Sequence, residues 1–151
     1  MKKRINTFFK YGTLLGTLGF IISTIIQIYS RFFMEKPPSW TEEASRFFFI
    51  YAVSFAAGLA MKDKSYVFFD GLYNTFSDSF KPKLTLFINI ITSFLFITFT
   101  IYSLKFVILG IPEKSPSMEI PMAIGFASMT LMGISITYYS IIDLIKNIKR
   151  K

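Results

Sequence analysis

The sequence of 151 residues contains neither cysteine nor histidine. Without cysteine, the chain can form neither a disulfide nor a thiolate metal site. Without histidine, it lacks the commonest metal ligand and the commonest general base in proteins. Haem anchors also depend largely on histidine ligands. These absences argue against a redox protein, a metalloenzyme and a haem-binding subunit.

Charge is missing from long parts of the sequence, of which 52% is hydrophobic. The three longest charge-free stretches lie at 11–30, 84–104 and 120–142. A membrane-spanning helix needs about 20 apolar residues to cross about 30 Å of hydrocarbon, so each stretch can span. A fourth stretch, 47–61, covers only about 22 Å at 1.5 Å per residue. Its helix must therefore begin earlier, which places Glu42, Glu43 and Arg46 in the headgroup layer.

These stretches predict an all-α membrane protein with one domain over residues 1–151. The predicted transmembrane helices cover about 11–30, 40–61, 84–105 and 121–143. The first follows a basic segment, MKKR, as a signal peptide would, but no small-x-small cleavage motif comes after it. We expect this first span to be retained.

Most lysine and arginine residues lie in three alternate segments, namely the N-terminus, the region between spans 2 and 3, and the C-terminus. These residues are Lys2, Lys3, Arg4, Lys10; Lys62, Lys64, Lys81, Lys83; and Lys146, Lys149, Arg150, Lys151. Positive charge marks the cytoplasmic side of a membrane protein. The pattern predicts both termini in the cytoplasm and a bacterial cytoplasmic (inner) membrane location. Because the charges flank spans and form no continuous face, nucleic-acid binding is not expected.

Small residues recur at helical spacing in the first two spans. Such residues let helix backbones approach closely in lipid, although glycine is also simply common in spans. The third span is poor in glycine and alanine and is expected to face lipid, with Asn89 bonded to a neighbouring helix. The helix-packing candidates are Gly12, Gly16, Ala52, Ala56, Gly58 and Ala60.

The segment 65–80 combines aromatic residues at helical spacing with polar residues on the other faces. Lysines flank it on both sides. This pattern predicts an amphipathic helix in the cytoplasmic membrane surface, in contact with lipid. The alternative is an irregular aromatic-rich loop. The residues of the predicted apolar face are Phe69, Leu72, Tyr73, Phe76 and Phe80.

The densest polar cluster precedes the second span and contains Trp40, Glu42, Glu43 and Arg46. Arg46 lies three residues after Glu43 and four after Glu42, so either acid can pair with it on one helix face. Ser39 followed by Glu42 predicts a capping box, and Trp40 is favoured at a membrane interface. Two interpretations stay open: a helix cap with an interfacial ion pair, or a contact with another subunit.

No predicted span carries an ionisable residue near its middle, where functional sites of membrane proteins place one. The sequence also offers no catalytic triad, phosphate loop or metal-ligand cluster. Between the last two spans, Pro112, Pro116 and Pro121 predict a loop of fixed shape. These features predict an accessory subunit that has no active site. We expect this chain to need no cofactor.

Two stretches resemble the small membrane subunit of tripartite ATP-independent periplasmic (TRAP) transporters, the DctQ-like family. The first is PSWTEEASR at 38–46, running on to DGL at 70–72; the second is KSPSMEIPM at 114–122. The family has a Trp-(Ser/Thr)-Glu-Glu core followed by Arg, and a Ser-Pro motif before its last helix. Where the family often has a Gly-His pair, this chain has Lys64-Ser65-Tyr66, so no role tied to that His is assigned here.

The resemblance implies a partner, a large multi-span permease (M) subunit that holds the substrate and sodium sites. A periplasmic substrate-binding protein would deliver an organic acid of the dicarboxylate or sialic-acid type, and a sodium gradient would drive import. The small subunit would scaffold the large one and help to dock the binding protein through Trp40, Glu42, Glu43 and Arg46. The alternatives are a self-associating small exporter or channel and a membrane-anchored enzyme or respiratory subunit.

Overall fold

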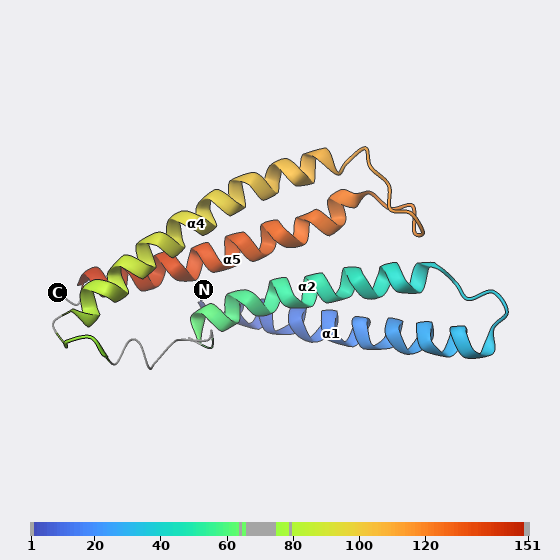
Figure 1. Ribbon diagram of the computed structural model, residues 1–151, viewed down its shortest axis with the longest axis horizontal. Coiled ribbons are helices and arrows are strands. Elements are labelled where there is room, and N and C mark those ends of the chain that lie inside the picture. Colours follow the sequence, from blue (N-terminus) through green and yellow to red (C-terminus); the bar gives the residue numbers. More distant parts are fainter. Residues whose placement is uncertain (1, 64, 66–74, 79, 150–151) are drawn as a thin grey trace.

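The computed structural model describes residues 2–63, 65, 75–78 and 80–149. Four long helices dominate them (Figure 1). The helices are α1 (Lys2–Phe33), α2 (Trp40–Lys62), α4 (Lys81–Leu109) and α5 (Met122–Lys149). All four are long and apolar enough to cross a membrane. The predicted all-α, four-span fold class is confirmed, while the orientation in the membrane stays a prediction.

The helices form two antiparallel hairpins, α1 with α2 and α4 with α5, which meet along α2 and α5 (Figure 1). The loops 34–39 and 110–121 lie at the same end of the molecule, each closing one hairpin, and the chain termini lie toward the other end. The outer helices α1 and α4 bury much less of their surface than the inner helices α2 and α5. Much of α4 is thus left open to lipid or to a partner.

The α1 and α2 backbones approach closely at Gly16. A Cβ atom built on Gly16 would lie 2.9 Å from the Cα of Ala52, which is itself 8% exposed. Gly12 faces the ring of Phe55 one turn away. The G-x-x-x-G pair therefore lies on the face of α1 that receives α2, as small residues allow in lipid.

The inner helices α2 and α5 meet at Gly58. A Cβ atom there would lie 2.6 Å from the Cβ of Ser135, so only glycine fits without a shift. Ala56 and Ala60 are half-buried. The small residues of α2 therefore serve two faces, with Ala52 toward α1 and Gly58 toward α5.

Hydroxyl pairs join α4 to α5. The Oγ atoms of Ser93 and Ser140 lie 2.7 Å apart, and the Thr130 hydroxyl donates to Ser103 Oγ at 3.0 Å. Asn89, expected from the sequence to bond a neighbouring helix, makes no such bond within the described part of the chain. Short hydroxyl side chains instead make the Ser93–Ser140 and Thr130–Ser103 hydrogen bonds between α4 and α5.

Most of the predicted interfacial helix over 65–80 lies outside the described residues, including Phe69, Leu72 and Tyr73. Phe76 and Phe80 are described, and their ring centroids lie 5.3 Å apart just before α4. Nearby, Lys81 Nζ donates to Asp78 Oδ1 at 2.8 Å, and this hydrogen bond lowers the pKa of Asp78. The interfacial helix stays a prediction.

Candidate functional site

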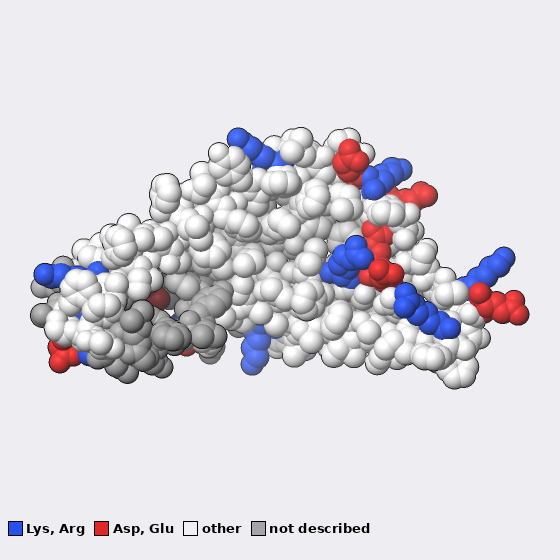
Figure 2. Space-filling view, in the orientation of Figure 1, with Lys and Arg blue, Asp and Glu red and all other residues white. Residues whose placement is uncertain are grey.

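Charged side chains gather toward the two ends of the molecule and leave a mostly uncharged band between them (Figure 2). The end with the loops 34–39 and 110–121 holds the polar cluster singled out in the sequence. Trp40, Glu42, Glu43 and Arg46 all lie in the first two turns of α2. We call these four residues and the loop 110–121 the loop-end surface.

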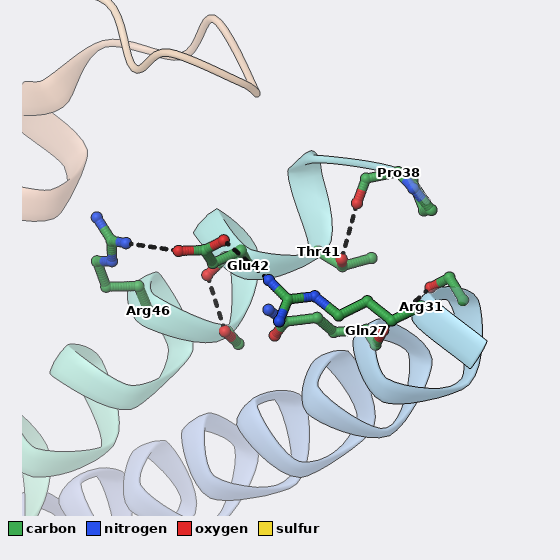
Figure 3. Close-up of polar contacts among 8 residues, drawn as sticks. Gln27, Arg31, Pro38, Thr41, Glu42 and Arg46 are labelled. Carbon is green, nitrogen blue, oxygen red and sulfur yellow. Dashed lines mark hydrogen bonds and ion pairs between the residues drawn. The ribbon is translucent and has the colours of Figure 1, made fainter. Parts of the chain in front are cut away.

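The predicted capping box at the start of α2 is wrong. Ser39 has helical backbone angles, φ −69° and ψ −24°, and its side chain makes no capping bond. A capping serine needs an extended backbone to direct its hydroxyl at the first turn. The Thr41 hydroxyl instead donates to the carbonyl of Pro38 at 2.9 Å (Figure 3). Glu42, the expected partner of the box, turns toward arginine.

The Glu42 carboxylate lies between two arginines (Figure 3). Its Oε1 accepts a hydrogen bond from Arg46 Nη2 at 3.2 Å, and its Oε2 lies 4.0 Å from Arg31 Nη2 at the end of α1. Of the two pairings that the spacing allows, the ion pair of Arg46 is thus with Glu42. The three side chains are 57–71% exposed, so solvent screens the pairs and each contributes about 0.2–1 kcal/mol.

Glu43 turns the other way, toward the loop 110–121. Its Oε2 accepts hydrogen bonds from the backbone N–H of Ser117 at 2.9 Å and of Met118 at 2.8 Å. Hydrogen bonds to an ionised acceptor are stronger than those between neutral groups. Glu43 therefore ties α2 to a loop more than 70 residues further along the chain.

Backbone hydrogen bonds also hold the loop 110–121 together and join it to the first residue of α5. The Ser115 N–H donates to the Ile120 carbonyl at 2.8 Å, and the Met122 N–H donates to the Glu113 carbonyl at 2.8 Å. Lys114 and Pro121 form an antiparallel bridge. These bonds, with the three prolines, give the loop a defined shape.

Trp40 lies in the first helical turn of α2 and is 45% exposed. Its ring therefore remains available at the edge of the loop-end surface. An amphipathic ring in this place suits a membrane interface or a protein contact.

An apolar groove of about 740 Å³ runs beside α1 and α2. Leu15, Phe48 and Phe55 line its helical walls. Met118 and Ile120 also line it, and they belong to the loop that Glu43 holds. The sequence did not predict this groove, because its walls come from three segments that are distant in the chain.

The polar side chains of this end form ion pairs and hydrogen bonds within the chain. Within the described residues, no group of three acidic side chains could hold a metal ion. In the polar cluster of α2, Glu42 pairs with Arg46 and Arg31, and Glu43 accepts hydrogen bonds from two backbone amides of the loop 110–121. Such an arrangement suits recognition of another protein.

Comparison with known families gives a specific match. The family described as "Tripartite ATP-independent periplasmic transporters, DctQ component" matches residues 20–150. The matched part contains α2, α4, α5 and all four residues of the polar cluster. A search of curated proteins finds no match.

Proposed function

The chain belongs to the family of DctQ components of tripartite ATP-independent periplasmic transporters, and on that basis we propose that it braces a large permease subunit and helps to dock a periplasmic substrate-binding protein. As a member of this family it is a small permease component of a transporter and a multi-pass inner-membrane protein. The observation that carries the proposal is the family match together with the loop-end surface.

The scaffold half of the proposal is supported by the uneven burial of the helices. The outer helices α1 and α4 leave most of their apolar side chains exposed. The groove beside α1 and α2 is lined almost entirely by apolar and small side chains. Helices associate in lipid through such close, small-residue packing. We propose that a helix of the large subunit packs along this groove.

The docking half is supported by the position and shape of the loop-end surface. Both short loops lie at this end, and Glu43 joins the second of them to α2. A surface that is already ordered loses little conformational freedom on binding. The predicted topology, with both termini in the cytoplasm, would place this end in the periplasm, where a binding protein is found.

The transported solute is proposed to be an organic acid of the dicarboxylate or sialic-acid type, imported with sodium. The resemblance of this sequence to the family supports this part. Substrate and sodium would bind to the large subunit, because none of the four predicted spans of this chain carries a charged residue near its middle. In this account the small subunit sets the position of the transporting subunit and of its delivery protein.

Reconstitution in liposomes tests the proposal. The chain, the large permease from the same organism and its binding protein are combined with an inward sodium gradient. Labelled succinate and labelled N-acetylneuraminate serve as the two probes. We expect uptake of at least one probe only when all three proteins and the gradient are present. Uptake by the chain alone would support the alternative of a self-associating exporter or channel.

A further inference from the structure

We propose that Glu43 is a positioning residue: it holds the loop 110–121 in the conformation that docks the binding protein, without touching that protein itself. This inference rests on the proposed function and gives Glu43 a role different from that of a contact residue. It follows from the bonds that Glu43 makes and from the shape of the loop.

A single oxygen of Glu43 accepts hydrogen bonds from two successive backbone N–H groups, at 2.9 Å and 2.8 Å. The carboxylate therefore fixes the two peptide units on either side of Ser117, those that join it to Pro116 and to Met118. The oxygen that does this points at the loop and not at solvent, and the residue is half-buried. The hydrogen bonds that Glu43 makes therefore go to the loop of this same chain.

The loop needs such a support at this point. Glu119, directly after the bonded pair, has φ 54°, in the left-handed region that residues other than glycine seldom adopt. The Glu119 N–H donates to the Ser115 carbonyl only at 3.2 Å. Glu43 thus anchors the two residues that precede the least favourable backbone conformation in the loop.

The anchored loop presents its other side outward. Glu113, Lys114, Ser117 and Glu119 are exposed, whereas Ser115 between them is buried. The side chains available to a binding protein are therefore spaced by the loop backbone, whose position depends on Glu43. Loss of the carboxylate would leave the identity of these exposed side chains unchanged. The loop would no longer hold them in a single conformation.

Two readouts on the reconstituted complex test this role. The complex of the chain with the large permease is placed in nanodiscs, and hydrogen exchange is followed in the peptide that contains Ser117 and Met118. The dissociation constant for the purified binding protein is measured on the same samples. The variants are Glu43→Ala and Glu43→Gln, because glutamine keeps an acceptor oxygen but not its charge. The control is Asp143→Asn, which removes a carboxylate paired with Lys146 near the opposite end of α5.

We expect amide exchange in this peptide to increase in the order wild type, Glu43→Gln, Glu43→Ala. The dissociation constant should rise in the same order, by about five-fold or more for alanine, as expected from the loss of charge-assisted hydrogen bonds at a partly exposed site. The yield of assembled complex and both readouts should be unchanged in the control.

Unchanged amide exchange in Glu43→Ala would overturn the anchoring role. Faster exchange with an unchanged dissociation constant would overturn the link between the loop and docking. If the wild-type complex bound no binding protein while exchange still rose in the variants, the proposed docking function would be wrong and the anchor would survive as a local feature of the fold. A merely structural role would lower the yield of the complex and leave the affinity of the assembled fraction unchanged.

Discussion

Gly16 of α1 lies directly against the backbone of Ala52 in α2, so that a Cβ atom at position 16 would lie 2.9 Å from the Ala52 Cα. Real Cβ atoms essentially never come this close to another atom. The contact between α1 and α2 therefore depends on the absence of a side chain at this position. In lipid, such close backbone packing replaces the hydrophobic effect as the force that holds helices together.

Replacing Gly16 by valine should therefore push α1 away from α2. Overpacking of a tight contact costs about 1–3 kcal/mol. We expect a lower free energy of unfolding for Gly16→Val in denaturant titrations of the purified chain in detergent. Thr17→Leu adds volume to the same helix at an exposed position and should have little effect. Equal stability of Gly16→Val and wild type would mean that the two helices do not pack at Gly16.

The hydroxyls of Ser93 and Ser140, 2.7 Å apart, should couple energetically across α4 and α5. Measured couplings of this kind between membrane helices average about 0.6 kcal/mol, with a maximum near 1.7 kcal/mol. In a double-mutant cycle with Ser93→Ala and Ser140→Ala, the double variant should lose less stability than the two single variants together. Strict additivity would show that the pair contributes nothing.

Replacing Arg46 by alanine should change the stability of the chain by less than about 1 kcal/mol, because its ion pair with Glu42 is exposed. Glu42 also keeps Arg31 within 4.0 Å. Thermal unfolding with and without added salt measures this effect, which salt should diminish further. A large loss of stability would show that Arg46 is more than an exposed, solvent-screened charge in the folded chain.

The absence of cysteine makes the topology directly measurable. Single cysteines at Lys36 and Lys114 report on the two loops at one end, and a cysteine at Ser65 reports on the region between α2 and α4. With both termini in the cytoplasm, a membrane-impermeant maleimide should label the first two positions in intact spheroplasts. It should label position 65 only after permeabilisation. The reverse pattern would invert the orientation and place the loop-end surface in the cytoplasm.

The sequence was sufficient to predict four spanning helices, because uncharged apolar stretches of about 20 residues match the thickness of the hydrocarbon layer. The helices themselves extend beyond the predicted spans. For example, α1 begins at Lys2 although its charge-free stretch begins at residue 11. Charged residues at the interface do not end a helix, since long basic side chains can reach the headgroups while the backbone stays helical. The absence of charge therefore marks the hydrocarbon layer and not the ends of the helix.

The contacts of the loop-end surface could be predicted only in part. The spacing of Glu42 and Arg46 allowed their pairing because four residues bring side chains onto one helix face. No local pattern connects Glu43 with Met118, which lie 75 residues apart and meet only when the hairpins pack. The capping box failed for a related reason: the rule assumes an extended Ser39, and the structure gives this residue a helical backbone. Residue identity alone does not set that conformation.

The central claim is that this chain works as the small subunit of a larger permease. Purification of the tagged chain from its native membrane in a mild detergent, followed by mass spectrometry of the proteins that accompany it, tests this most directly. The account predicts recovery, in stoichiometric amount, of one large multi-span permease subunit. Recovery of the chain only with further copies of itself would contradict the account and favour a self-associating exporter or channel.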